Sequence, residues 1–426
     1  MADAAPVTAA PAAAAEARAA GAVPSPPGHG PLTVGVEEEF LLVDGETGRP
    51  VACAADVLDD AATGAPLPGG TQLKRELLAC QAEVTSGVCT GLDELADQLH
   101  AGRQRLAAAA QRTGLRPVAT GTPVLAGPYA ALSEGPRYEH ISRIYEGVVA
   151  DYEACGCHVH VGVPDRGTAV AVVNHLRPWL PSLLALSVNS PFHDGRDTGY
   201  GSWRMVLQSR FPGAGVPPHQ PSPAAYDAQL ERLVDCGALA DVRQSFSLAR
   251  PSPCFPTVEI RAADAAATVD EAVLQAALSR ALVRTALAAL EEGREAVPVA
   301  DEVAAAAVWS ASRHGLRGPG VHPRLERKAA PLTLVHELLA YVAPALDESG
   351  DLDRVRRLLA AVVKHGTGAE RQRDAAASAP RRDLRAVVDH LARETVSTPA
   401  FQLPGSATAL RTAPAAPRPD TTRRTS

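Results

Sequence analysis

The chain has 426 residues, a formal net charge of −7 and 46% hydrophobic residues, so it can form a sizeable core and is not a wholly disordered protein. Its acidic balance and 4% aromatic content argue against a nucleic-acid-binding surface, because phosphate contacts need clustered Lys and Arg and base stacking needs exposed rings. The seven cysteines are odd in number and irregularly spaced, which favours reduced thiols over a disulfide framework.

The sequence predicts neither a membrane span nor a secretion signal. The apolar stretch 276–290 is interrupted by Arg280 and Arg284 well before the roughly 20 residues that a bilayer requires. The N-terminus carries Asp3 where a signal peptide would carry Lys or Arg. We therefore expect a soluble, cytoplasmic protein that associates with neither membranes nor nucleic acid.

The two ends of the chain differ in composition from the rest. Residues 1–30 are rich in Ala, Pro and Gly, and residues 404–426 mix Pro, Thr, Ala and Arg without a pattern. We expect both to be disordered tails. Residues 31–403 contain no linker-like stretch and are expected to form one domain. Within it, the prolines of 211–223 favour a long surface loop.

Two kinds of periodicity indicate a mixture of helices and strands. Apolar residues three or four positions apart favour helices, and short alternating segments rich in Val and Ile favour strands of one sheet. In chain order, the patterns predict a strand at 33–43, a helix at 92–112, a strand at 157–162, a helix at 168–187, a strand at 257–261, a helix at 269–291 and two helices within 331–365.

The three predicted strands share one design, in which one face is apolar and the other is polar. Successive side chains of a strand point to opposite faces, so residues two apart share a face. Glu38 is the exception, because it is acidic yet lies on the apolar side. The polar face is expected to carry Glu37 and Glu39 from the first strand, His158 and His160 from the second, and Thr257, Glu259 and Arg261 from the third.

A polar strand face often simply meets water. This one, however, concentrates carboxylates and imidazoles, the side chains that bind metal ions. Glu37 and Glu39 would lie about 7 Å apart, where two charges repel by about 2 kcal/mol at an effective dielectric of 20. We therefore expect a cation on this face. Oxygen ligands with an imidazole favour Mg²⁺ or Mn²⁺, which suggests phosphoryl chemistry.

A zinc site is the alternative for the second strand, because Cys155, Cys157, His158 and His160 form a C-x-C-H-x-H string. Strand alternation places the cysteines opposite the histidines, so all four could bind one ion only if the backbone bulged. The sequence also lacks a Walker-type loop and the G-x-G-x-x-G and G-x-S-x-G strings. ATP would then bind to a metal-lined sheet with Arg and Lys pairing its phosphates.

A series of motifs occurs in a fixed order between residues 32 and 316. They are VGVEEEF from Val34, LKRELLACQAEVTSGVC ending at Cys89, RY at Arg137, CHVHVG from Cys157, ALSVNSPF, GRDTGYGSWR ending at Arg204, RPSPCFPTVEIRAAD ending at Asp264 and SRHGL from Ser312. Together they resemble the carboxylate–amine ligases known as glutamate–cysteine ligase type 2. The resemblance implies an α+β, glutamine synthetase-like fold, in which an antiparallel sheet has helices packed on one face and an open face that binds ATP and metal ions. Residues 31–403 would be a single catalytic domain.

The resemblance also implies roles for individual residues. Arg261 would contact the transferred phosphate and would be catalytic together with Glu259. Lys74, Arg204 and Arg250 would pair with nucleotide phosphate or with the substrate carboxylate. The metal ligands would be Glu37, Glu39, Glu83, His158 and Glu259, with Glu76 and His160 as their neighbours. Glu76 and Glu83 lie seven apart, on opposite faces of a straight strand, so periodicity alone does not place both.

The implied reaction has two steps. A substrate carboxylate is phosphorylated by ATP, and the acyl phosphate is then attacked by an amine to give an amide, ADP and phosphate. We expect small-molecule amino acid and amine substrates, nominally glutamate and cysteine, with ATP and Mg²⁺ or Mn²⁺ as cofactors and a homodimer as the family's assembly. The alternatives are a relative that binds nucleotide or amino acid without turnover, and a metal-dependent hydrolase.

The chain departs from the family pattern at four positions. Many relatives carry Asp-x-Arg where this chain has Leu248-Ala249-Arg250, and many have His where this chain has Pro123. Cys254 replaces a more usual basic or polar residue, and Ala307 lies where some members have Asn. The polar face is retained, so these departures bear on the substrates and on the level of activity.

Overall fold

The protein is described by a computed structural model that covers residues 32–128 and 131–399, so both predicted tails lie outside the described residues. Its centre is a seven-stranded sheet in the order β2-β3-β1-β5-β9-β8, with β4 also paired to β1. Every pairing is antiparallel, which confirms the α+β class expected from the sequence. The sheet strands are β1 (Val34–Asp44), β2 (Gln72–Arg75), β3 (Gln81–Thr85), β4 (Leu115–Val118), β5 (Gly156–Gly162), β8 (Ala249–Pro251) and β9 (Thr257–Asp264), and two small hairpins pair β6 (Phe192–His193) with β7 (Arg196–Asp197) and β10 (Gly320–His322) with β11 (Arg327–Ala329).

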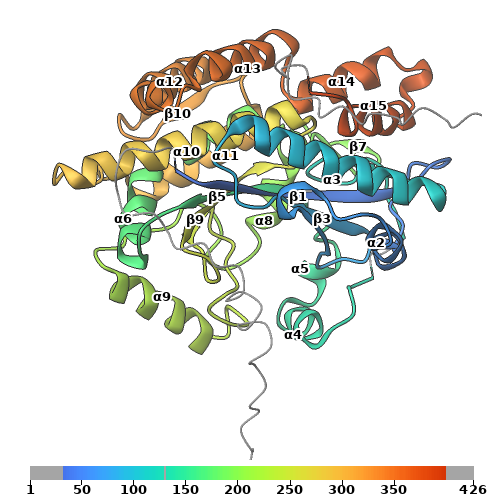
Figure 1. Cartoon of the computed structure of the whole chain (residues 1–426), viewed down its shortest axis with the longest axis horizontal. Coiled ribbons are helices and arrows are strands. Elements are labelled where there is room, and N and C mark those ends of the chain that lie inside the picture. Colours follow the sequence, from blue (N-terminus) through green and yellow to red (C-terminus); the bar gives the residue numbers. More distant parts are fainter. Residues whose placement is uncertain (1–31, 129–130, 400–426) are drawn as a thin grey trace, which may run out of the picture.

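Helices cover one face of the sheet in two layers (Figure 1). The long helices α3 and α10 pack on the sheet, and α12 and α13 pack on α10 from outside. On the other side of the sheet, α4, α5 and α9 stand at the periphery (Figure 1). The helices are α2 (Ala54–Ala62), α3 (Leu92–Arg112), α4 (Pro136–Tyr145), α5 (Gly147–Ala150), α6 (Arg166–Leu176), α7 (Leu180–Ser187), α8 (Trp203–Gln208), α9 (Pro223–Asp235), α10 (Val269–Glu291), α11 (Asp301–His314), α12 (Pro331–Glu348), α13 (Leu352–His365), α14 (Gly368–Ser378) and α15 (Arg385–Thr395), with 3₁₀ turns η1 (Pro68–Gly70) and η2 (Pro380–Arg382).

The predicted helices are found, with one correction. Helices α3 and α10 have the predicted bounds, and α12 and α13 are the two helices expected within 331–365. The single helix predicted at 168–187 is wrong, because the chain forms α6 and α7 with a break around Pro178. Proline has no N–H to donate and its ring clashes with the preceding helical turn, so a continuous helix ends there.

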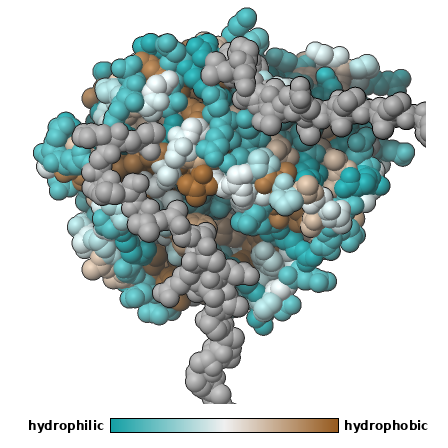
Figure 2. Space-filling view, in the orientation of Figure 1, coloured by the Kyte–Doolittle hydropathy of each residue, from teal (hydrophilic) through white to brown (hydrophobic). Residues whose placement is uncertain are grey.

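Helix α10 is the central helix of the protein core. Within the described residues it is the one helix that is long and apolar enough to cross a membrane, but 72% of its most apolar window is buried inside the protein. Its Arg280 is buried, donates to the carbonyl of Thr90 at 2.8 Å and pairs with Asp351. The described surface in Figure 2 is largely hydrophilic, because the apolar faces of the helices are turned inward.

The proline-rich segment 211–223 is a loop as predicted, since it forms neither helix nor strand before α9 begins at Pro223. It does not lie wholly on the surface, however. Arg177 Nε donates to the Pro217 carbonyl at 2.8 Å, and Asn174 exchanges two hydrogen bonds with the backbone of Gln220 at 2.8 and 3.0 Å. These contacts attach the loop to α6, because buried backbone groups need partners.

The apolar face of the sheet forms the main hydrophobic core. Alternation places six aliphatic residues of β1, β5 and β9 on the helix side, where each is at most 3% exposed. Burying side chains of this kind stabilises the fold by roughly 1.5–3 kcal/mol each. These residues are Val34, Val36, Val159, Val161, Val258 and Ile260.

Glu38, the acidic residue on the apolar side, is buried against Arg103 of α3. Both side chains are at most 1% exposed, and Arg103 Nε donates to Glu38 Oε2 at 3.0 Å while its Nη2 donates to Oε1. The guanidinium also donates to the backbone carbonyls of Ala266, Ala267 and Thr395, so all of its N–H groups are used. This ion pair joins the sheet, α3 and the end of α15.

We expect Arg103→Met to lower the free energy of unfolding by about 3–5 kcal/mol, because it leaves Glu38 buried and unpaired. Urea denaturation measures this loss. Arg112→Met is the matched control on the same helix, since Arg112 pairs with Asp60 at the surface and its loss should cost under about 1 kcal/mol. Equal effects of the two substitutions would contradict the role assigned to Arg103.

Candidate active site

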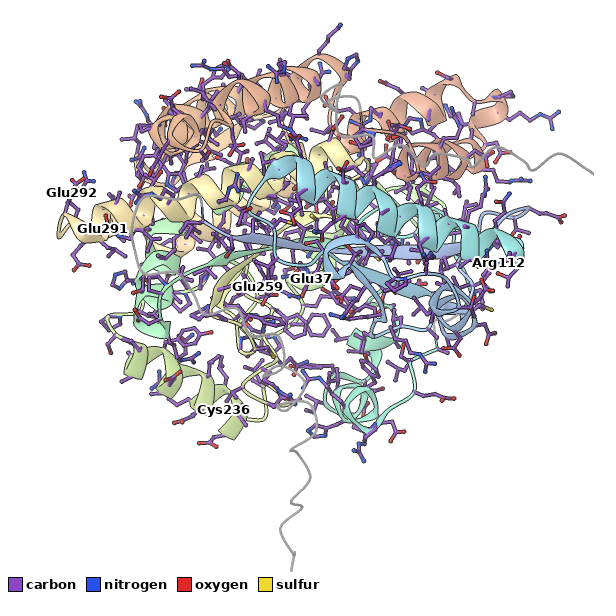
Figure 3. All side chains as sticks on the ribbon, viewed as in Figure 1. Glu37, Arg112, Cys236, Glu259, Glu291 and Glu292 are labelled. Carbon is purple, nitrogen blue, oxygen red and sulfur yellow. The ribbon has the colours of Figure 1, made fainter. Side chains whose placement is uncertain are left out.

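The strand register brings the predicted ionisable residues together on one face of the sheet. Glu37 and Glu259 lie side by side under the sheet in Figure 3, although they are far apart in the sequence. The seven predicted metal-binding residues come from β1, β3, β5 and β9 and from the turn before β3, and three cross-strand pairs connect six of them. These pairs are Glu39 with Glu83, Glu37 with His158, and His160 with Glu259.

The turn between β2 and β3 places Glu76, which periodicity alone could not position. Lys74 of β2 is paired with Glu83 of β3, so the two share a face. Glu76 lies two residues beyond Lys74 and therefore points to the same side. The chain reverses direction between Glu76 and Glu83. The two carboxylates therefore lie close together across the hairpin, although they are seven residues apart in the sequence.

The site residues form two groups that could each hold a cation. In each group one ligand atom from every residue lies within 4.8 Å of the others. The first group combines oxygen and nitrogen donors, and the second contains oxygen donors alone. The first is Glu37, His160 and Glu259, and the second is Glu39, Glu76 and Glu83.

His158 lies between the two groups. Its Nδ1 is 3.6 Å from Glu37 Oε2, and its Nε2 is 3.6 Å from Glu39 Oε1. The side chain is 3% exposed, and Nε2 has no hydrogen-bond partner among the described residues. A buried nitrogen aimed at carboxylates without a hydrogen bond is what a metal ligand presents when the ion is absent.

His160 has a similar arrangement with a fixed ring orientation. Its Nδ1 lies 2.9 Å from Thr257 Oγ1, and its Nε2 lies 3.4 Å from Glu37 Oε1 without a hydrogen bond. A hydrogen bond on one ring nitrogen sets the orientation in which the other nitrogen faces a metal. The donor types, their burial and the unpaired imidazole nitrogens therefore fit a divalent cation.

Two arginines are attached to Glu259. Arg250 Nε donates to Glu259 Oε2 at 2.7 Å, and Arg261 Nη1 donates to Oε1. Arg261 Nη1 also lies 3.3 Å from His158 Nδ1, so this guanidinium is beside both the carboxylate and the imidazole. The arrangement places positive charge next to the first cation group.

The other two predicted basic residues lie at opposite depths. Lys74 Nζ is 3.8 Å from Glu83 Oε1, with a side chain that is 45% exposed, so it stands at the rim. Arg204 is buried, and its Nη2 donates to the Arg261 carbonyl at 3.3 Å. All the site residues predicted from the sequence therefore lie on or beside one face.

In the first group the carboxylates are ionised. Burial alone would raise the pKa of Glu37, but contacts with His158 and His160 outweigh it and hold the pKa well below the usual value. Burial is likewise outweighed at Glu259, where Arg261 and Arg250 hold the pKa far below the usual range.

The second group favours protonated carboxylates unless positive charge is added. Burial and repulsion from Glu76 raise the pKa of Glu39 to about 8. Burial and repulsion from Glu37 and Glu76 raise the pKa of Glu83 well above its usual value. Burial, reinforced by Arg261, lowers the pKa of His158 to about 4, so its imidazole is neutral and can bind a metal.

The geometry does not support the zinc alternative. Cys157 packs in the main core with Val159, and Cys155 packs in a second core with Leu41. Neither belongs to a described group that could hold a metal ion. The bulge in this part of the sheet falls in β9 opposite His158, so β5 keeps its alternation. All seven cysteines are free thiols.

A backbone group and a close approach complete the site, and the sequence analysis missed both. The Gly156 N–H donates to Glu39 Oε2 at 2.6 Å. A Cβ at Gly156 would lie 2.5 Å from Arg204 Nη2 and 2.9 Å from His158 Nε2, so only glycine fits there. A backbone donor leaves no side-chain signature, and the glycine before the CHVHVG string was the only available signal.

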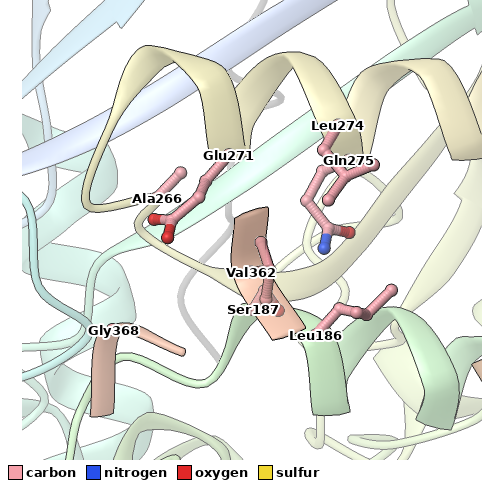
Figure 4. A pocket seen from close by; sticks show the side chains of 8 residues that line it. All are labelled: Leu186, Ser187, Ala266, Glu271, Leu274, Gln275, Val362 and Gly368. Carbon is pink, nitrogen blue, oxygen red and sulfur yellow. The ribbon is translucent and has the colours of Figure 1, made fainter. Parts of the chain in front are cut away.

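Two features lie away from the polar face. Leu248, where relatives often carry Asp, is fully buried in the main core, so this position contributes no side chain to the site. A small cavity lined by residues of α7, α10, α13 and α14, among them Glu271 and Gln275, shares no residue with the ionisable cluster (Figure 4).

Comparison with known proteins connects this geometry to a family. A family profile described as "Glutamate-cysteine ligase family 2" matches residues 33–390. A protein of Saccharopolyspora erythraea, provisionally named glutamate–cysteine ligase 2-2, is 55% identical over 387 residues, which cover 91% of this chain and 96% of that protein.

Solved structures share the fold at low sequence identity. A glutamate–cysteine ligase from Francisella tularensis in complex with AMP aligns with a TM-score of 0.63 and 13% identity, covering 87% of this chain and 90% of that one. The ligase of a prokaryotic ubiquitin-like protein, solved in complex with it, aligns with a TM-score of 0.53 and 13% identity, covering 86% and 73%. These likenesses show the fold.

We expect the metal-free protein to lose stability as pH rises from 6.5 to 8. The folded-state pKa of Glu39, about 8, exceeds that of an unfolded glutamate, so its contribution is complete at low pH and is lost as pH rises toward 8, by up to about 1.4 kcal/mol per pH unit. Thermal unfolding with chelator measures this loss. MgCl₂ should restore more stability at pH 8 than at pH 6.5.

Two variants separate the cluster from other buried acids. Glu39→Gln should flatten the pH dependence and weaken the response to MgCl₂. Glu153→Gln is the control, because burial raises the pKa of Glu153 to about 7 while its carboxylate contacts Cys80, so it should flatten the pH dependence without changing the MgCl₂ response. A wild-type stability that is constant or rises over this range would contradict the assignment.

Proposed function

The chain belongs to glutamate–cysteine ligase family 2 and is an ATP-dependent carboxylate–amine ligase, and we propose that it forms a γ-glutamyl amide from L-glutamate and L-cysteine or another amine. A carboxylate is phosphorylated by ATP, and the amine then displaces phosphate from the acyl phosphate. The observation that carries this proposal is the meeting of five carboxylates, two imidazoles and four basic side chains on one sheet face.

Divalent cations, Mg²⁺ or Mn²⁺, would be held by the two groups of the polar face. Glu37, His160 and Glu259 would hold one, and Glu39, Glu76 and Glu83 another, with His158 able to serve either. When bound, such ions neutralise phosphate charge and polarise the phosphoryl group. The carboxylates of the first group are ionised without a cation, whereas a bound cation would favour ionisation of Glu39 and Glu83 in the second group.

The basic side chains of the chain would bind and orient the anionic substrates. Arg261 lies beside Glu259 and His158 and is the residue that we propose contacts the transferred phosphoryl oxygens through charge-assisted hydrogen bonds. Arg250 is fixed by Glu259 next to it. Lys74 stands at the rim, and Arg204 lies in the interior, so they would meet different anionic groups of the bound substrates.

We also propose that 31–403 forms one catalytic domain. Contacts between distant parts of the chain support this, because Arg103 donates to the Thr395 carbonyl at 3.1 Å and the Ala119 N–H donates to Thr395 Oγ1 at 2.9 Å. The free thiols support the proposal of a reducing, cytoplasmic location. The homodimer stays a prediction of the family resemblance.

The amine and the reaction are tested together. The protein is incubated with ATP, MgCl₂, L-glutamate and a panel of amines that includes L-cysteine, and ADP and product mass are measured. We expect ADP release that depends on one amine and a product with the mass of its γ-glutamyl amide. ADP release that is indifferent to every amine would instead indicate hydrolysis, and nucleotide binding without release would indicate a relative that has lost turnover.

Glu259→Gln should abolish turnover, because it removes a cation-binding carboxylate and the acceptor that fixes Arg250 and Arg261. The initial rate of ADP formation measures the loss. Glu292→Gln is the matched control, since Glu292 lies at the far end of α10 from the site (Figure 3) and should leave the rate unchanged. A near-normal rate for Glu259→Gln would remove Glu259 from the catalytic residues.

A further inference from the structure

Residues of three sequence motifs converge on one buried carboxylate at the end of β9. Asp264 is fully buried and accepts hydrogen bonds from the Asn189 N–H at 2.9 Å, Ser190 Oγ at 2.7 Å and Ser202 Oγ at 2.8 Å. Burial raises the pKa of Asp264, and the charge of Arg204 together with these three hydrogen-bond donors partly offsets that effect. Segments more than sixty residues apart in the sequence are thereby joined at a single point.

Each serine hydroxyl that binds Asp264 also accepts a hydrogen bond from the first turn of α8. Ser190 Oγ donates to Asp264 and accepts from the Arg204 N–H at 3.1 Å. Ser202 Oγ donates to Asp264 and, as the N-cap of α8, accepts from the Met205 N–H at 3.2 Å. Because each serine hydroxyl donates its hydrogen to Asp264, its oxygen lone pairs face the backbone N–H groups of α8. Asp264 therefore holds the first turn of α8, which carries Arg204, in place.

Missing side chains make room for this network. A Cβ at Gly121 would lie 2.8 Å from Ser190 Oγ and 2.9 Å from the Asp264 carboxylate. A Cβ at Gly156 would lie 2.5 Å from Arg204 Nη2. The carboxylate and the guanidinium therefore both pack closely against glycine backbone.

Asp264 and Arg204 form a loose ion pair that, within the described part of the chain, leaves one guanidinium nitrogen without a hydrogen bond. Arg204 Nη1 lies 3.8 Å from Asp264 Oδ1 and has no hydrogen-bond partner among the described residues, although Arg204 is 2% exposed. Arg261 Nε is likewise buried and unpaired. The two residues are in direct contact, since Arg204 Nη2 donates to the Arg261 carbonyl at 3.3 Å. Buried charged donors without acceptors are costly unless a ligand completes them.

We propose that Asp264 is a positioning residue that, through Ser190 and Ser202, holds Arg204 so that Arg204 and Arg261 together bind an anionic group of a substrate. This inference rests on the proposed ligase function. It places the binding position of that anion in the interior of the site. The ligand is a carboxylate or a phosphoryl group, since both offer oxygen acceptors to paired guanidinium donors.

The test measures direct binding to the full chain in MgCl₂ by isothermal titration calorimetry, with L-glutamate and inorganic phosphate as separate probes. We expect Asp264→Asn to weaken binding of one anion about 10- to 100-fold, as the loss of a hydrogen-bond partner that orients a metal ligand weakens metal binding. Loss of glutamate binding assigns the anion as a carboxylate, and loss of phosphate binding assigns it as a phosphoryl group. Mn²⁺ affinity should be unchanged, which a general collapse of the site would not allow.

Ser202→Ala tests the same proposal if Asp264→Asn does not fold. It should weaken binding of the same anion. Ser279→Ala is the control, because Ser279 is a buried serine of α10 whose hydroxyl has no partner among the described residues. Unchanged anion affinity in the folded variants, or no binding of either anion to the wild type, would overturn the proposal. Failure of the ligase reaction would appear separately, as the lack of amine-dependent ADP release.

Discussion

The repulsion among carboxylates that share one sheet face governs the rest of this structure. Glu37, Glu39, Glu76, Glu83 and Glu259 are close enough that burying them together is unfavourable without positive charge. The chain supplies part of this charge with arginines and a lysine around the cluster. We propose that divalent cations supply the remainder, which accounts for the buried imidazole nitrogens that have no hydrogen-bond partner among the described residues.

The two halves of the face solve this problem differently. Near β9, arginine and histidine partners keep the carboxylates ionised. Near β3, burial and mutual repulsion prevail, and the acids favour protonation. The first half therefore already has the charge that cation binding needs, whereas the second must lose protons as a cation enters. His158, neutral and between the halves, is free to join either.

Rigid support for the face comes from its reverse side and from the ends of the strands. The aliphatic face of the sheet packs on α10, and the Glu38–Arg103 pair ties β1 to α3 and α15. At the end of β9, Asp264 accepts hydrogen bonds from Asn189, Ser190 and Ser202, which connects β9 to the segment before β6 and to the start of α8. The side chains of the polar face therefore project from strands and helices that the core and these contacts hold in place. Fixed positions of this kind would suit the binding of anionic substrates.

The sequence by itself determined which side chains of a strand share a face and where the long helices run, because period-two alternation and helical periodicity are properties of the local backbone. That was enough to select the polar face of β1, β5 and β9, and the bounds of α3 and α10. Pro178 was also a local signal, for a helix break. It was overlooked because the apolar periodicity continues on both sides of the proline. Strands of three or four residues, such as β2 and β8, are too short to show a period.

Only the tertiary structure decided which segments meet. It brought Glu76 to Glu83 by a hairpin, gave Glu38 a partner in Arg103, and divided one acidic face into two cation groups. It also supplied the Gly156 backbone donor and the serine contacts of Asp264. These relations depend on packing between residues distant in sequence, and local propensity carries no information about such distances.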